Sequence, residues 1–224
     1  MFRFRIALFV VAMLLCLTMS LLPKQVVAQG GAHSPWQHHC GLRQSGPFSV
    51  GVDAGIMTHL GDIKMHRLAP DPSEVRYSGA FFVDYRIWDN YSLRLRLMDG
   101  RMAGIRGSQS FQTDLFETAA AGIIDLFPGL LGSGTHNFRL YALGGAGILF
   151  FDARLSVNDQ PEDEASGSAL VFFGGMGISY RTGQYLKIFM ESSNRLTTSD
   201  QLDAFVSNLN DAYNVTSLGV SFHF

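Results

Sequence analysis

The stretch that decides the fold is Tyr91-Ser92-Leu93-Arg94-Leu95-Arg96-Leu97, in which apolar and polar residues alternate without a break. A helix would scatter the two arginines around its circumference. A β-strand places both on one face and the leucines on the other. The segment is therefore predicted to be a strand with one charged face and one apolar face.

The same alternation recurs in segments of about ten residues separated by turn residues, which is the pattern of a transmembrane β-barrel. Eight antiparallel strands are predicted, at residues 48–56, 77–87, 91–97, 114–127, 138–151, 169–181, 185–195 and 213–224. In the fifth predicted strand, Leu149-Phe150-Phe151 places large apolar side chains on both faces, so the sequence does not decide which face points inward. The predicted fold is all-β, an eight-stranded antiparallel outer-membrane barrel that follows a cleaved signal peptide.

The connections between the predicted strands also alternate in length. Short turns are expected at 89–90 and 182–184, and long polar loops at 62–76, 105–112, 156–168 and 196–212. Short periplasmic turns and long external loops are typical of outer-membrane barrels. The connection at 128–137 departs from this pattern, because it should be short and has ten residues.

One face of the predicted sheet collects five acids and seven bases. They are Asp53, Asp84, Arg86, Arg94, Arg96, Glu117, Asp125, Arg139, Arg181, Lys187, Glu191 and Arg195. A soluble lipocalin-like barrel or sandwich would turn this face to water and enclose the apolar one. We favour the membrane barrel, in which an eight-strand lumen holds charges that pair and lipid covers the apolar face.

The charges inside such a barrel could also line a channel. A salt-bridged plug is preferred, because eight strands leave room only for side chains.

The first residues read as a secretory signal peptide. Arg3 and Arg5 precede an apolar run over 6–22, and Val26-Val27-Ala28 offers a cleavage site, although a membrane anchor has a similar length. The predicted organisation is a signal peptide at 1–28, a flexible segment at 29–46 and a barrel at 47–224.

The composition of the mature chain limits its partners and cross-links. Without residues 1–28 the chain carries 14 basic and 19 acidic residues, a net charge of −5, which argues against a nucleic-acid partner. Its one cysteine, Cys40, excludes an internal disulfide.

No cofactor, metal or catalytic site is expected. His33, His38, His39 and Cys40 have metal-ligand side chains but lie in a stretch that contains Gly and Pro, so a flexible extension is preferred. His223 and Ser221 are the nearest approach to a nucleophile with a base, without an evident acid. Calcium at Asp159 and the acids 162–164 is weighed against a solvated loop, which is preferred. The glycine runs 144–147 and 174–177 lie within strands and are interpreted as relief of crowding or bending points.

Several stretches resemble a known family of small outer-membrane barrels from Bacteroidetes-type bacteria that includes PorG, a component of the type IX secretion system. The stretches are 48–51 leading to His59-Leu60-Gly61-Asp62-Ile63, 110–117 followed by Asp125-Leu126-Phe127-Pro128, 140–151, and 198–203 followed by 210–213 and the closing strand. The resemblance covers most of residues 47–224. The family usually has an aromatic where Gln201 stands and an acid where Ala204 stands.

The resemblance implies a non-enzymatic part in the secretion apparatus. Barrels similar to PorG associate with a periplasmic ring lipoprotein, PorK, and its partner PorN. The oversized turn with Leu130 and Leu131 is the candidate contact, and outer-membrane lipid is the other expected partner. The ending with Phe222 and Phe224 resembles the signal that barrels show to their assembly machinery. A general OmpA-like barrel for envelope integrity or adhesion is the alternative.

Overall fold

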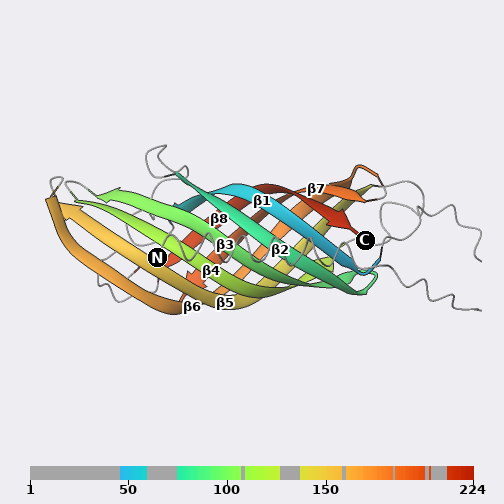
Figure 1. Ribbon diagram of the computed structural model, residues 1–224, viewed down its shortest axis with the longest axis horizontal. Helices are drawn as coiled ribbons and strands as arrows, with labels where there is room; N and C mark the ends of the chain where they lie inside the picture. Colours follow the sequence, from blue (N-terminus) through green and yellow to red (C-terminus); the bar gives the residue numbers. More distant parts are fainter. Residues whose placement is uncertain are drawn as a thin grey trace, which may run out of the picture. The chain divides into compact units, whose positions relative to one another are not determined.

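Eight antiparallel strands form a closed barrel, as predicted, in which each strand pairs with its neighbours in sequence and β1 also pairs with β8 (Figure 1). This is a computed structural model. It describes residues 46–59, 75–106, 109–126, 137–157, 160–183, 185–199, 202 and 211–224. The predicted signal peptide, the His33 to Cys40 segment and the turn with Leu130 and Leu131 lie outside these ranges. No helix in the described ranges is long and apolar enough to cross a membrane.

The strands differ in length by almost a factor of two. Their bounds are β1 Phe48–His59, β2 Arg76–Trp88, β3 Tyr91–Arg106, β4 Gln109–Asp125, β5 Phe138–Val157, β6 Gln160–Arg181, β7 Leu186–Thr197 and β8 Ala212–His223. The end that holds the β2–β3 and β6–β7 connections and the C-terminus is called the turn end below. The opposite end is called the loop end.

The apolar residues face outward and the charged residues face inward, as predicted for the membrane barrel. Leu95 on β3 is 60% exposed, whereas its neighbours Arg94 and Arg96 are 2% and 4% exposed. On β6 the outward apolar stretch runs from Leu170 to Tyr180, which matches the nine to eleven residues that a tilted strand needs to cross a bilayer. The alternative of a soluble barrel with an apolar interior behind a charged surface is therefore wrong.

Two of the predicted long loops are largely strand. The β3–β4 connection leaves only 107–108 between the strands, where 105–112 was predicted, and the β5–β6 connection leaves only 158–159, where 156–168 was predicted. The β5–β6 hairpin consequently extends beyond the loop ends of β1, β7 and β8 (Figure 1). Above the apolar belt its outward residues turn polar, with Arg154, Glu164 and Ser168 exposed.

The loop-end half of the bore is apolar, in contrast to the charged interior that was predicted. Inward side chains of six strands and one loop residue are fully or almost fully buried there: Met57, Met98, Leu115, Leu149, Val171, Val215 and Leu202. Leu202 caps this layer. Its carbonyl oxygen accepts a hydrogen bond from Thr113 Oγ1 at 2.5 Å, and its N–H donates to Asp211 Oδ2 at 2.9 Å. The structure also decides the parity of β5, because Leu149 and Phe151 are buried and Phe150 is exposed.

A small polar cluster interrupts the lipid-facing surface of β7 and β8. Asn214 Nδ2 donates to Asn194 Oδ1 at 2.8 Å, and Thr216 Oγ1 donates to Asn214 Oδ1 at 3.0 Å. The hydroxyl of Ser192 lies 3.0 Å from that of Thr216. Polar groups in hydrocarbon are costly unless they are hydrogen-bonded, and this mutual pairing reduces the cost.

The glycine runs relieve crowding on the inward side, as interpreted from the sequence. A Cβ on inward Gly145 would meet the carbonyl oxygen of Ala120 and the ring of Phe173, the latter at 2.7 Å. A Cβ on its outward neighbour Gly144 would come no closer than 3.7 Å to any other residue, an ordinary contact.

The two adjacent glycines therefore predict opposite outcomes for the same substitution. Gly145→Ala should lower the free energy of unfolding by about 1–3 kcal/mol, because a backbone carbonyl and an aromatic ring must move. Gly144→Ala should change it by less than about 0.5 kcal/mol. Urea unfolding in phospholipid vesicles, followed by tryptophan fluorescence, measures both. Equal effects at the two positions would contradict the packing argument.

Candidate functional site

The centre of the bore is filled by an ion-paired layer built around Arg94 of β3. Its Nε lies 2.7 Å from Asp84 Oδ1 on β2, and its Nη1 lies 2.8 Å from Glu191 Oε2 on β7. The guanidinium also stacks on the Phe82 ring, with its carbon 4.0 Å from the ring centroid. One arginine thereby joins β2, β3 and β7 across the bore.

Arg96 extends the same layer by one step along β3. Its Nη2 lies 2.8 Å from Asp53 Oδ1 on β1, and its Nη1 lies 2.9 Å from Glu191 Oε1. Glu191 therefore accepts hydrogen bonds from both arginines, and the hydroxyl of Tyr141 adds a third at 3.2 Å. The layer is closed from wall to wall by charge-assisted hydrogen bonds.

A second ion pair lies between this layer and the apolar layer. Arg195 Nε is 3.0 Å from Glu117 Oε2, and both side chains have no exposed surface. The hydroxyl of Tyr213 donates to the same carboxylate oxygen at 2.7 Å, and Arg195 Nη1 donates to Ser193 Oγ at 2.6 Å. Glu117 Oε1 and Arg195 Nη2 are buried and have no hydrogen-bond partner within the part of the chain that the structure describes.

The twelve predicted interior charges do not balance. All five acids are paired, and they pair with five bases: Arg94, Arg96, Arg195, Arg139 with Asp125 at 2.9 Å, and Lys187 with Asp84 at 4.0 Å. Arg86 and Arg181 are left over. Among the described residues neither has an ion pair within 4.0 Å or a side-chain hydrogen bond. Among the twelve predicted charges, two arginines therefore have no ion pair in the described part of the chain, and both lie at the turn end.

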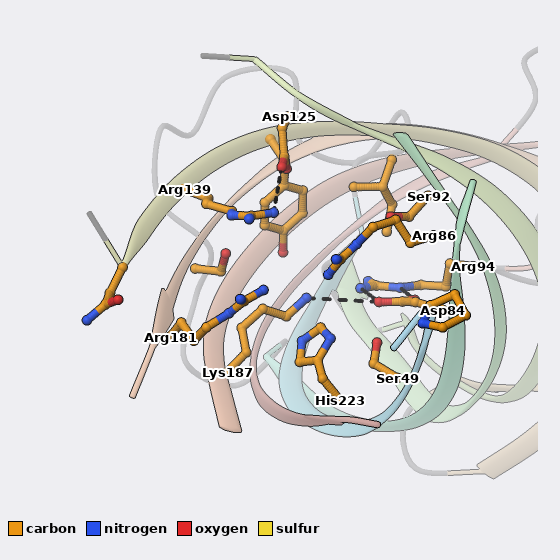
Figure 2. Close-up of a pocket in the computed structure, with 15 residues that line it drawn as sticks. Ser49, Asp84, Arg86, Ser92, Arg94, Asp125, Arg139, Arg181, Lys187 and His223 are labelled. Carbon is orange, nitrogen blue, oxygen red and sulfur yellow. Dashed lines mark hydrogen bonds and ion pairs between the residues drawn. The ribbon is translucent and has the colours of Figure 1, made fainter. Parts of the chain in front are cut away.

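Both of these arginines line a pocket at the turn end of the bore, which we call the mouth pocket (Figure 2). It is an open cavity, and about 620 Å³ of space lies within it when the solvent-filled opening is included. Its polar lining consists of Ser49, Asp84, Arg86, Ser92, Arg94, Asp125, Asn137, Arg139, Tyr141, Ser179, Arg181, Lys187 and His223. Five of these side chains are cationic and two are anionic. Figure 2 shows Arg181 and Lys187 next to each other on one side of a shared space and Arg86 on the other side.

The structure does not bring catalytic or metal-binding groups together in the ranges that it describes. Ser221 Oγ and His223 Nε2 are both buried, and neither has a hydrogen-bond partner there. No group of three or more His, Cys, Asp or Glu that could hold a metal occurs in those ranges either. Phe222 and Phe224 face outward and are 50% and 40% exposed, and their role as an assembly signal stays a prediction.

Solved structures with a similar fold were found, although no protein-family model and no curated protein matches the sequence. The attachment invasion locus protein Ail of Yersinia pestis aligns with a TM-score of 0.50 and 14% identity, over 81% of this chain and 100% of the Ail chain. Neisserial surface protein A aligns with a TM-score of 0.52 and 16% identity, over 80% of this chain and 99% of that one. The shared feature is the fold. This chain is a small closed barrel of the outer-membrane type.

Sequence reasoning missed the uncharged members of the site. Tyr141 and Tyr213 donate to buried carboxylates, and Phe82 lies under the Arg94 guanidinium. Phe82 could have been placed inward, because it lies two residues from the predicted inward Asp84 on the same strand, and Tyr213 because it lies an odd number of residues from outward Phe222. The face of Tyr141 could not be predicted, because the parity of its strand was undecided. The acid that each side chain contacts is determined by the closure of the barrel, and no local sequence pattern predicts those contacts.

Proposed function

We propose that this protein is a non-enzymatic barrel of the bacterial outer membrane, exported by a signal peptide that is cleaved near Ala28, and that it acts as a membrane-embedded scaffold. The observation that supports this role is that side chains fill the bore of the barrel. Two ion-paired layers, around Arg94 and Arg195, are followed by an apolar layer under Leu202. A bore closed in this way leaves solutes no continuous aqueous path, which favours a structural part over transport.

The scaffold proposal predicts that the reconstituted protein does not conduct ions. The full mature chain in a planar bilayer should give no steady open-state current at voltages where a sixteen-stranded porin, added to the same bilayer as a control, gives stable steps. The physical reason is that each buried ion pair would have to separate in a low-dielectric bore. Reproducible current steps of fixed size from this chain would exclude a scaffold with a closed bore.

The more specific form of the proposal is a PorG-like structural or adaptor component of the type IX secretion apparatus. It rests on the sequence resemblance. The turn end faces the periplasm if the barrel has the usual orientation, in which termini and short turns are periplasmic. The candidate contact with a PorK/PorN-like ring, Leu130 and Leu131, belongs to the connection between β4 and β5 and lies outside the described residues.

Shortening residues 128–136 to a tight turn tests this contact. The variant should insert normally, as judged by the different gel migration of folded and heated barrel, but should no longer co-purify with a periplasmic ring lipoprotein and its partner from outer membranes in mild detergent. The wild-type chain purified in parallel is the reference. Co-purification that survives the shortening would reject this contact.

A general OmpA-like role in envelope integrity or adhesion is the second candidate, and the tall β5–β6 hairpin favours it. Exposed Arg154, Glu164 and Ser168 give this hairpin a polar outer surface beyond the apolar belt. Such a surface can recognise molecules outside the cell without a passage through the bore. Purification of the wild-type protein with its partners separates the two roles, because a periplasmic ring supports the first and an extracellular ligand supports the second.

A further inference from the structure

Arg86 and Arg181 differ from the other arginines of the lumen, because they have no ion pair in the described part of the chain. Arg94, Arg96 and Arg195 are buried and held by carboxylates, so an eight-strand barrel of this kind does pair the cations that it encloses. Arg86 and Arg181 are half-buried and have no such partner among the described residues. Two like charges that are partly removed from water repel each other, and their repulsion favours the entry of an anion.

The surroundings of the two arginines strengthen this preference. Asp84 and Asp125 are the two acids of the mouth pocket, and both are engaged: Asp84 by Arg94 and Lys187, Asp125 by Arg139. With five cationic and two anionic side chains, the pocket lining has an excess of positive charge, and low-dielectric walls around such an excess concentrate the field at the opening. The pocket therefore attracts anions from the aqueous side of the turn end.

The cationic donors reach the pocket from two sides. Arg86 comes from β2, Arg181 from the end of β6 and Lys187 from the start of β7 (Figure 2). The side chains of Ser49 and Ser179 also line the pocket. Arg181 and Lys187 are paired neighbours on β6 and β7, and Arg86 lies on the other side of the pocket. Cationic donors on two sides suit a tetrahedral group, whose oxygens point in several directions, better than a planar carboxylate. Guanidinium is also the side chain that binds phosphate through paired hydrogen bonds.

We propose that the mouth pocket is a binding site for a doubly charged tetrahedral oxyanion of the phosphate class, held between Arg86 and Arg181 with Lys187 as the third cation. Two negative charges compensate the two unpaired arginines. The site lies at the turn end, so the anion comes either from the aqueous compartment or from a phosphorylated lipid head group next to the rim. This proposal goes beyond the scaffold function and does not depend on it.

The test uses the full mature chain, folded in micelles of an uncharged sugar detergent that contains no phosphate. Inorganic phosphate is titrated in by calorimetry at low ionic strength. Wild type should show saturable binding that weakens with added chloride, because the attraction is electrostatic. Arg86→Gln/Arg181→Gln should bind at least tenfold more weakly. Arg154→Gln removes a cation from the exposed β5–β6 hairpin and should bind as wild type does. Cooperative thermal unfolding at or above the wild-type temperature establishes that each variant is folded.

A second arm identifies the source of the anion. A short-chain phosphatidic acid is titrated into the same micelles, with and without inorganic phosphate. Lipid binding that phosphate displaces and that the double variant lacks supports the site with a lipid head group as occupant. Binding of inorganic phosphate alone supports a soluble occupant. The proposal is overturned if neither probe binds saturably, or if the double variant binds as tightly as Arg154→Gln.

Discussion

Replacing Glu117 with leucine is expected to lower the free energy of unfolding of the barrel by about 3–5 kcal/mol, because the substitution leaves a charged guanidinium buried without a partner. Glu117 and Arg195 both have zero exposed surface, so water cannot take the place of the lost carboxylate. The hydroxyl of Tyr213 also loses its acceptor. Urea unfolding in phospholipid vesicles gives the midpoint and the slope from which this loss is calculated.

The double variant Glu117→Leu/Arg195→Met is the control for that prediction. It removes both charges and replaces them with apolar groups of similar size, so most of the lost stability should return. The return is favoured here because the wild-type pair already leaves Glu117 Oε1 and Arg195 Nη2 buried without partners in the described structure. A double variant as unstable as Glu117→Leu would show that the pair itself, and not the buried lone charge, determines stability at this level of the bore.

The second large effect is expected on the outside of the barrel. Leu95→Arg should destabilise the protein in vesicles by about 2–4 kcal/mol, the usual cost of arginine on the lipid face near the bilayer midplane. Leu95 is 60% exposed and lies between outward Leu93 and Leu97 on the same strand. Its neighbours across the sheet, Val83 and Ala120, offer no carboxylate to pair with the new charge.

Ser168→Arg is the matched control, because Ser168 also faces outward but lies on β6 beyond the apolar stretch that begins at Leu170. Arginine there should change stability by less than about 0.5 kcal/mol. If Leu95→Arg were as harmless as Ser168→Arg, the surface around Leu95 would not be in contact with hydrocarbon, and the membrane barrel would have to be abandoned.

The faces of the strands were predictable from the sequence, because a period of two is a local property. Leu95 and Arg94 differ by one position, and that difference alone places one in lipid and the other in the bore. The predicted inward charges, including those of Asp53 and Glu191, follow from the same rule. The strand order was also predictable, because short connections favour pairing between strands that are neighbours in sequence.

The ion pairs and the loop end were not predictable. Arg94 and Glu191 are 97 positions apart, and they meet only because β8 closes on β1 and brings β7 across the bore. Above the membrane the alternation of hydrophobicity ends. The outward residues of the β5–β6 hairpin are polar, and inward Ala153 and Ala169 are small. A stretch with two weakly apolar faces resembles a loop in sequence, which explains why 156–168 was predicted wrongly.

Because the strands differ in length, the edge of the barrel at the loop end is uneven. On β6 ten residues precede Leu170, the first outward apolar side chain of the belt. At about 3.3 Å per residue and a tilt near 40°, the hairpin rises about 25 Å above the hydrocarbon. The barrel wall is therefore tall at the β5–β6 hairpin, whereas β1, β7 and β8 end closer to the membrane. A molecule that moves along the membrane plane toward β5 and β6 would therefore meet the polar outer face of this hairpin before it reaches the end of the bore.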